Sequence, residues 1–416
     1  MSEAMVMKDV VRPGAPYGRM NDQPMAACLL KEPADSTYLA PRPKPPAWSP
    51  GSLRLIGSLS LPPSRREPAV YRRSFIDDYV PNESSLLPAA LARQLHAAAF
   101  WRETLPYGTC GARMMNEFLL DFSWSSSRLE GNPLSRPEAA EVLGRPRPGA
   151  GDALPASKDE TMVINHQLAI DVMLRYARPA GLTRRLVEQM HAALMRNLLG
   201  NPDDLGRVRR HKVEIEHSVY SPCAIPALLQ EVLEHVVAKA SVTRNPVEAA
   251  FFLWVNLAYL QAFADGNKRT SRLSANVPLL LANCAPLTFV DVDRSDYATA
   301  MLGVYEQGDL SAAIDLFEWT YRRSMRRYLT MLERQPGPDP HHQRHYHAIT
   351  QAMQAVVIDR KSLPAAVAEL RLHAPDDAVV SRILRQALTA LHESSGAAYR
   401  LSPEQVMSWI AGGRPH

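Results

Sequence analysis

An uncharged run, Ala249–Leu260, constrains the fold of this chain more than any other feature. Its apolar residues fall on every side of a helix, so other elements must surround that helix. A chain of 416 residues, of which 46% are hydrophobic and 22% charged, can supply such a core. The run is shorter than the roughly 18–20 residues of a membrane span, and it contains Asn256. The sequence therefore predicts a helix buried in a globular core, with no membrane-spanning segment.

A polar stretch, Gln261–Arg272, follows the buried helix directly. After Gly266 the helical spacing of apolar residues resumes, so we expect a new helix to begin at Asn267. The first turn of a helix offers free backbone N–H groups and the positive end of the helix dipole. This arrangement is typical of a site that binds an anion.

Two arginines and one acid accompany that helix start. Arg269 and Arg272 are three residues apart and share a helix face, where two guanidinium groups match a polyphosphate better than a single carboxylate. Asp265 adds a hard oxygen ligand of the kind that Mg²⁺ accepts together with phosphates. These residues indicate a magnesium-nucleotide site. The simpler alternative is a polar loop that only caps the buried helix.

The same stretch resembles the signature of the Fic family, His-Pro-Phe-x-Asp/Glu-Gly-Asn-Gly/Lys-Arg-x-x-Arg. Gln261 stands where the family has His, and Ala262 where it usually has Pro. The matching positions are Phe263, Asp265, Gly266, Asn267, Lys268, Arg269 and Arg272. The resemblance implies an all-α Fic/Fido helical core that binds ATP with Mg²⁺ and transfers AMP to a hydroxyl of a protein target.

The resemblance also implies a role for each matched residue. Asp265 would hold the metal, Gly266, Asn267 and Lys268 would line the anion hole, and Arg269 and Arg272 would hold the phosphates. The family's His is the general base, so Gln261 marks a degenerate catalytic position, and the resemblance implies Asn267 as the other catalytic residue. An amide has no protonation equilibrium near neutral pH and cannot take the proton of the attacking hydroxyl.

The missing base leaves two functions open. A general base contributes about 10²–10⁴ in rate, whereas positioning and electrostatics do most of the work in phosphoryl-type transfer. A site with Gln261 could therefore transfer slowly, or it could bind nucleotide as a pseudoenzyme or regulatory interaction module. A weaker hypothesis is a growth regulator or toxin-like factor whose C-terminal bundle binds a partner. A donor other than ATP also stays open.

A second motif, Ser126-x-x-x-Glu130-Gly131, lies far upstream. Read alone, Gly131 ends a helix and Glu130 is a solvated terminal residue. The motif also resembles the inhibitory motif of Fic proteins that carry their brake N-terminal to the active site. That resemblance implies that Glu130 pairs with Arg272 and displaces the γ-phosphate, with Ser126 as the other inhibitory residue.

Residues 207–222 change to an alternating pattern that favours short strands. The resemblance implies a β-hairpin flap here, to which the protein substrate adds its backbone as a further strand. His211 and His217 could supply a substitute base, or they are simply exposed flap residues. His191 lies among apolar residues and is typical of a core histidine rather than a base.

Proline-dense segments suggest three parts. We expect a proline-rich N-terminal arm over 1–85, a Fic domain with inhibitory helix, flap and signature over 86–334, and a C-terminal accessory helical bundle over 335–416. Between 86 and 334, helices are expected at 87–100, 112–124, 160–177, 182–199, 225–240, 297–305 and 313–327.

Composition narrows the partners and the compartment. The net charge of +4 is too small to argue for nucleic acid or membrane, and the arginines within 322–327 are expected on a solvated helix face. The four cysteines have no metal or disulfide spacing, which is typical of reduced cytosolic thiols. No cleavable signal is visible at the start, so a cytoplasmic location is expected. A bacterial effector secreted without such a signal would look the same, and a homo-oligomer stays open.

Overall fold

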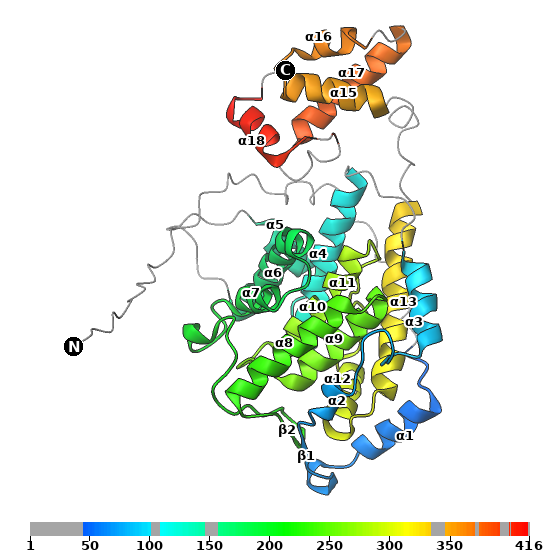
Figure 1. The fold of residues 1–416 in the computed structure, drawn as a ribbon, viewed down its shortest axis with the longest axis vertical. Helices are drawn as coiled ribbons and strands as arrows, with labels where there is room; N and C mark the ends of the chain where they lie inside the picture. The colour runs from blue at the N-terminus through cyan, green and yellow to red at the C-terminus, as the bar shows by residue number, and fades with distance from the viewer. Residues whose placement is uncertain are drawn as a thin grey trace, which may run out of the picture.

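The computed structural model describes residues 45–100, 109–145, 157–333, 346–370, 374–391, 399 and 401–414. Within these ranges the regular secondary structure is almost entirely helical, which confirms the predicted all-α class (Figure 1). The elements, in chain order, are α1 (Pro50–Leu59), η2 (Pro63–Arg65), β1 (Ala69–Val70), α2 (Ser74–Asp77), α3 (Ala89–Ala99), α4 (Thr109–Leu129), α5 (Arg136–Gly144), α6 (Lys158–Ala180), α7 (Arg184–Met195), η3 (Pro202–Asp204), β2 (Tyr220–Ser221), α8 (Pro226–Val242), α9 (Pro246–Leu260), α10 (Asn267–Ser274), α11 (Asn276–Leu281), α12 (Arg294–Leu302), the π-helical turn η4 (Gly303–Gln307), α13 (Ser311–Glu333), α15 (Tyr346–Val357), α16 (Leu363–Ala368), α17 (Ala374–Ala390) and α18 (Pro403–Ala411).

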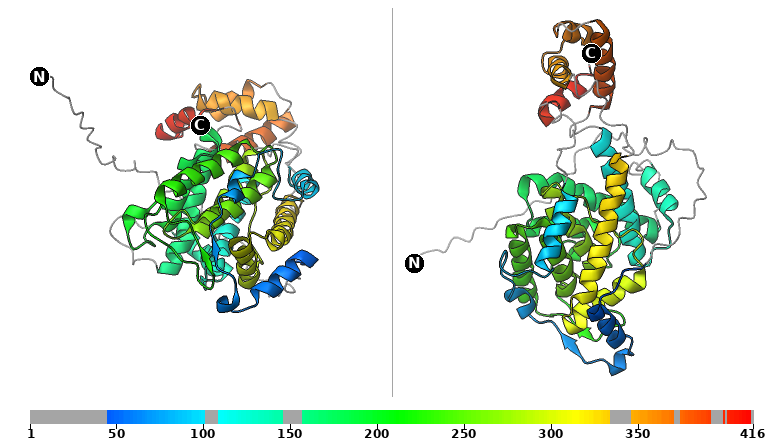
Figure 2. Two further views of the ribbon diagram at one scale, coloured as in Figure 1. Left: turned by 60° about the horizontal axis from the view of Figure 1, so that its bottom comes forward. Right: turned by 90° about the vertical axis from the view of Figure 1, so that its right-hand side faces the viewer.

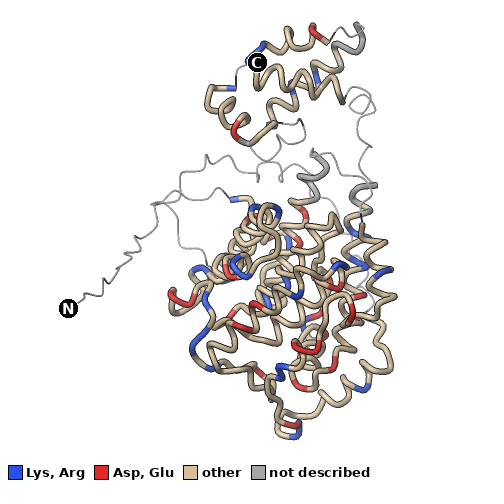
Figure 3. The backbone as a smooth tube through the Cα atoms, in the orientation of Figure 1, with Lys and Arg blue, Asp and Glu red and all other residues tan. Residues whose placement is uncertain are grey.

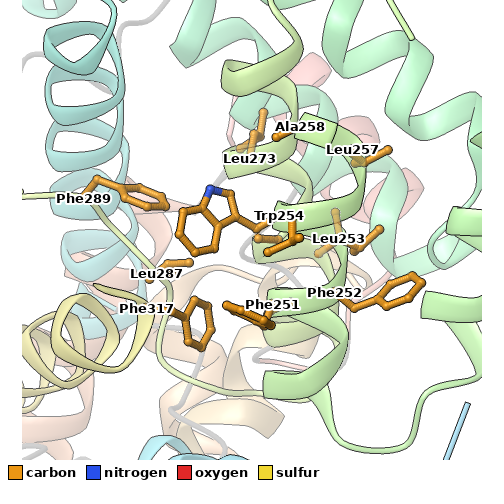
Figure 4. Packing of buried hydrophobic residues seen from close by; sticks show 14 of the residues in the cluster. Phe251, Phe252, Leu253, Trp254, Leu257, Ala258, Leu273, Leu287, Phe289 and Phe317 are labelled. Atoms are coloured by element: carbon orange, nitrogen blue, oxygen red, sulfur yellow. The ribbon is translucent and has the colours of Figure 1, made fainter. Parts of the chain in front are cut away.

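The uncharged run forms α9, and every residue of this helix is buried. The side chain of Asn245 caps the helix by accepting hydrogen bonds from the first-turn N–H groups, and Pro246 fits the first position, where no N–H is needed. Helices α3, α8, α10 and α11 pack against α9. At its centre Trp254 contacts the rings of Phe251, Phe289 and Phe317 (Figure 4). The helix is therefore the axis of the main core.

A second group of helices positions the upstream motif. Helix α6 packs against α7 and α4, and α10 contacts both α7 and α4. Asp121 of α4 is fully buried and accepts hydrogen bonds from Arg136 of α5 at 3.0 Å and from Arg327 of α13 at 3.0 Å. These charge-assisted contacts fix α4, the helix that carries Ser126, against two neighbours.

Residues 45–87 also pack on this core. Leu55, Ile76 and Tyr79 belong to the same hydrophobic cluster as α9. The buried carboxylate of Glu248 accepts hydrogen bonds from the N–H of Leu86 at 2.7 Å and from the hydroxyl of Tyr79 at 3.2 Å. The domain boundaries at 85 and 334 stay predictions, and the proline clusters before residue 45 lie outside the described residues.

Helices α15, α16, α17 and α18 share a hydrophobic cluster of their own, which is separate from the cluster around α9. Trp409 of α18 is fully buried in it, together with Met353 of α15 and Leu384 of α17. Figure 2 draws these helices in orange to red.

The expected β-hairpin over 207–222 is not formed, so that part of the prediction was wrong. Residues 207–219 contain no strand. The neighbouring β2 pairs in parallel with β1, with Ala69 opposite Tyr220. The partner of this strand is therefore a segment about 150 residues upstream rather than the other arm of a hairpin.

Side chains bind the backbone groups that a hairpin ladder would use. The buried guanidinium of Arg209 donates to the carbonyl oxygens of His211 and Cys223. Glu306 accepts a hydrogen bond from the N–H of Val219 at 3.1 Å. A backbone N–H or carbonyl that is bound to a side chain is less available to a neighbouring strand, so these contacts compete with strand pairing.

Basic and acidic residues are interspersed over most of the described chain (Figure 3). The arginines within 322–327 are less solvated than expected, because three of them form ion pairs with acidic residues of α13, α4 and the loop before α12. The pairs are Arg322 with Glu318, Arg323 with Asp291 and Arg327 with Asp121. Among the described residues, no helix combines the length and the apolar character that crossing a membrane requires.

Replacing Trp254 with alanine is expected to lower the free energy of unfolding by roughly 3–5 kcal/mol, because a fully buried ring leaves a cavity. Urea unfolding followed by tryptophan fluorescence and circular dichroism measures this change. Leu53→Ala is the control, since Leu53 is 57% exposed and its loss should change the free energy of unfolding by less than about 0.5 kcal/mol. Equal losses for the two variants would contradict the axial position of α9.

Candidate functional site

The signature stretch forms a tight turn between α9 and α10. Gln261 ends α9 in the left-handed region, at φ 51°, and Gly266 precedes α10 at φ 74°. This positive φ strains any residue with a Cβ, and a Cβ on Gly266 would also lie 2.5 Å from the Sδ of Met195, so glycine is favoured there. The side chain of Asn267 accepts a hydrogen bond from the N–H of Phe263 at 2.9 Å and donates one to its carbonyl at 2.8 Å. Hydrogen bonds between residues of the turn itself therefore stabilise it.

Helix α10 begins at Asn267, as predicted, and no side chain caps its N-terminus. Its first-turn N–H groups have no acceptor inside the helix. Arg269 is only 4% exposed, yet its Nε and one terminal nitrogen have no hydrogen-bond partner among the described residues. Buried guanidinium N–H groups without acceptors are costly. An anion with several oxygens would satisfy them together with the helix start.

Asp265 lies at the edge of this site. Its Oδ2 accepts a hydrogen bond from Arg269 at 3.1 Å and its Oδ1 accepts one from the N–H of Gly266 at 2.6 Å. The side chain of Asp265 is 65% exposed, so its carboxylate can reach a bound ion. Within the described ranges no group of three His, Cys, Asp or Glu side chains could hold a metal. Asp265 fits Mg²⁺ only as one ligand beside phosphate oxygens and water, which is how proteins commonly hold this ion.

The upstream motif reaches the same place. A terminal nitrogen of Arg272 donates to Oε1 of Glu130 at 2.8 Å, and Nζ of Lys268 lies 3.2 Å from Oε2 of Glu130. The side chain of Arg272 is 0% exposed and that of Glu130 15%. The structure thus brings Glu130 and Arg272 together. Lys268, expected in the anion hole, also contacts this carboxylate.

Ser126 contacts Arg272 twice. Its hydroxyl oxygen accepts a hydrogen bond from Nε of Arg272 at 3.0 Å, and its carbonyl accepts one from a terminal nitrogen at 3.0 Å. The hydroxyl also lies 2.9 Å from Nε2 of His166, a fully buried residue of α6. Sequence reasoning did not identify His166. Its only signal is that the pair Asn165 and His166 interrupts the otherwise apolar face of α6.

Gln261 is 8% exposed, and its amide nitrogen donates to the carbonyl of Ala258 at 2.7 Å. One end of the amide is thus bound to its own helix. Nearby, the buried Arg209 donates from Nε to the carbonyl of Gln261 at 2.7 Å and thereby joins the 207–222 segment to the signature turn. Sequence reasoning missed Arg209 as well, because nothing distinguishes it from the adjacent Arg210.

The three candidate histidines lie in different surroundings. His191 accepts a hydrogen bond at Nδ1 from the N–H of Gly206 at 3.0 Å, and its Nε2 lies 3.0 Å from the carbonyl of Asp265. Burial lowers its pKa to about 4, so it is a neutral core histidine, as expected. His211 and His217 are exposed, which agrees with the simpler alternative that the sequence left open for them.

The charge of Glu130 depends on its partners. Burial opposes ionisation of its carboxyl group, but attraction to Arg272, Lys268 and Arg269 outweighs burial and lowers the pKa to about 2. A carboxylate whose pKa is lower in the folded than in the unfolded state stabilises the fold above the unfolded pKa. That stabilisation is lost as the pH falls through the folded pKa.

We therefore expect Glu130→Gln to lower the free energy of unfolding at pH 7 by roughly 1.5–3 kcal/mol, the contribution of a hydrogen bond to a charged group. The difference between the native protein and the variant should stay constant above pH 4.5, the ordinary pKa of the side chain, and shrink from there toward pH 2. Urea unfolding of both proteins at several pH values measures it. A difference that does not change with pH would contradict an ionised Glu130.

Part of this chain is similar to known proteins. Residues 181–279 match the model of the Fic/DOC family. The chain is 25% identical over 255 residues to protein adenylyltransferase fic-1 of Caenorhabditis elegans, covering 59% of this chain and 48% of that protein. It is 26% identical over 206 residues to protein adenylyltransferase Fic of Drosophila melanogaster, covering 48% of this chain and 39% of that protein. The chain thus spans about half or less of the length of these relatives.

Two solved structures are also similar. A structure of Fic-1 from Caenorhabditis elegans has a TM-score of 0.46 and 21% identity, covering 63% of this chain and 72% of that chain. A Fic-domain-containing signaling protein from Bacteroides thetaiotaomicron has a TM-score of 0.47 and 18% identity, covering 58% of this chain and 96% of that chain. The family match encloses the signature turn, the 207–222 segment and helices α8, α9 and α10. Residues 181–279 are thus identified, by the family model, as a Fic/DOC-family match.

Proposed function

We propose that this chain is a nucleotide-binding protein that resembles protein adenylyltransferases. It would transfer AMP from ATP to a protein hydroxyl, releasing pyrophosphate, and Glu130 would inhibit it. One observation carries the proposal: two buried guanidinium groups with unpartnered N–H groups lie at an uncapped helix start, next to a carboxylate that contacts one of them. The names of the curated relatives support the reaction class.

The phosphates would bind at the start of α10. At this site, Nε and a terminal nitrogen of Arg269 and a terminal nitrogen of Arg272 have no hydrogen-bond partner among the described residues. A triphosphate has enough oxygens to accept from these donors and from the first-turn N–H groups at once. Asp265 would hold Mg²⁺, which supplies charge neutralisation for the phosphates when it is bound.

Glu130 would inhibit the protein by competing with a phosphate for the guanidinium group of Arg272. Glu130 is bound to Arg272 and lies close to Lys268, so it satisfies donors that a terminal phosphate would need. A phosphate that binds Arg272 must displace this carboxylate or share the site with it at a cost in repulsion. Glu130 thus lowers affinity for a nucleotide in the productive position.

The missing base decides how fast transfer can be. Gln261 cannot take up the proton of the attacking hydroxyl, and its amide nitrogen is bound to Ala258. Positioning and electrostatics remain, so we expect slow transfer. The position of Gln261 also favours the second candidate function, a nucleotide-binding pseudoenzyme or regulatory module. The protein target would dock along residues 207–222.

Glu130→Gly is expected to incorporate at least tenfold more α-labelled AMP into protein than the unmodified chain, because the carboxylate no longer competes for Arg272. Adding Arg272→Ala should return incorporation to background. Arg73→Ala, which removes an exposed arginine paired with Asp77, is the matched control and should change nothing. Equal incorporation with and without Arg272 would contradict the proposed phosphate site.

Gln261→His in the Glu130→Gly background should raise the transfer rate by about 10²–10⁴, the usual contribution of a general base. Single-turnover transfer from labelled ATP measures the rate, and calorimetry with magnesium-ATP measures binding separately. Binding without transfer in both proteins would favour the pseudoenzyme. No binding in either protein would reject a nucleotide function altogether.

A further inference from the structure

Arg272 has a second set of contacts besides Glu130. Both the hydroxyl and the carbonyl of Ser126 accept hydrogen bonds from its guanidinium group. Ser126 and His166, like Arg272, are fully buried, whereas Glu130 retains some exposure. The guanidinium group also lies 5.1 Å from the ring centre of Tyr297. Arg272 is thus held by a buried set of groups and by one carboxylate nearer to the solvent.

The hydrogen-bond partners of His166 fix its tautomer. Its Nδ1 lies 2.8 Å from the carbonyl of Met162, and because a carbonyl only accepts, Nδ1 carries the proton. Burial lowers the pKa of His166 to about 3, and the positive charges of Arg269 and Arg272 act in the same direction, so the ring is neutral. Nε2 therefore has a lone pair, and the Ser126 hydroxyl at 2.9 Å must donate to it.

This donation determines what Ser126 offers to Arg272. With its proton directed at His166, the hydroxyl presents lone pairs to Nε of Arg272 at 3.0 Å. A hydroxyl without an acceptor at His166 could turn its proton elsewhere, and the contact with Arg272 would lose its direction. The hydrogen bonds thus run in one direction, from Arg272 to Ser126 to His166 to Met162.

We propose that His166 is a positioning residue that, through Ser126, holds the guanidinium group of Arg272 in place when Glu130 gives way to phosphate. Removing Glu130 takes away one contact of Arg272 and leaves both contacts with Ser126. The guanidinium group then needs no reorganisation to receive a new anion, which is an advantage for binding. We call the hydrogen-bonded set of His166, Ser126 and Arg272 the anchor. The expected effect of the anchor on nucleotide affinity rests on the proposed function, whereas the anchor itself does not.

The first test uses the Glu130→Gly protein and calorimetry with magnesium-ATP. His166→Leu keeps a similar volume but removes the acceptor, and we expect it to raise the Kd about tenfold, the effect of one buried hydrogen bond. His166→Gln retains a donor and an acceptor and should stay within about threefold of the parent. His96→Leu removes a histidine of α3 outside this network and should leave the Kd unchanged. If Gln fails to rescue, or Leu has no effect, the proposal is wrong.

The second test needs no nucleotide and separates the anchor from the proposed function. In protein labelled with ¹⁵N-arginine, the Nε–H signal of Arg272, assigned by its loss in Arg272→Ala, should exchange slowly with solvent. It should survive Glu130→Gly and His166→Gln but exchange at least tenfold faster in His166→Leu and Ser126→Ala.

The ¹⁵N shifts of His166 in the unmodified protein should report a protonated Nδ1 and a bare Nε2 at pH 7. A protonated Nε2 would overturn the anchor even if the leucine variant fails to fold. A slow Nε–H signal in a protein that binds no ATP would leave the anchor standing and reject the nucleotide site.

Discussion

The burial of Arg272 is the constraint on which the site depends. A guanidinium group cannot lose its proton in a protein, so a side chain with 0% exposure must find acceptors or pay a large desolvation cost. The chain supplies them from α4, through Ser126 and Glu130, and steadies Ser126 from α6, through His166. The guanidinium group of Arg272 in α10 is thereby linked to α4 and α6, which lie far from it in the sequence. Since one terminal nitrogen of Arg272 stays without a partner among the described residues, the site is not fully satisfied by the protein alone.

The parts of the structure that follow from local sequence were predictable. An uncharged run of this length favours a buried helix, and a glycine before a new helical pattern favours a turn, so α9 and the start of α10 were predictable from residues 249–267. The contact of Glu130 with Arg272 came from a resemblance at two places and not from periodicity. The opposite charges of Glu130 and Arg272 also favoured a contact between the two motifs.

The parts that depend on distant partners were not predictable. Alternation over 207–222 is compatible with a strand, but a sequence does not say which strand will pair with it, and β1 proved to be the partner of β2. Arg209 and His166 act through backbone carbonyls and a serine hydroxyl. Such acceptors occur everywhere along a chain, so they leave no pattern in the sequence.

Two different demands meet at Arg272. In the proposed function, the carboxylate of Glu130 regulates access to this guanidinium group, while the buried Ser126 and His166 fix its orientation. The most direct measurement of the central claim compares the Kd of magnesium-ATP with that of magnesium-ADP, in the unmodified protein and in Glu130→Gly. We expect the γ-phosphate to add at least tenfold affinity only when Glu130 is absent. An ATP-to-ADP preference that is the same in both proteins would contradict it.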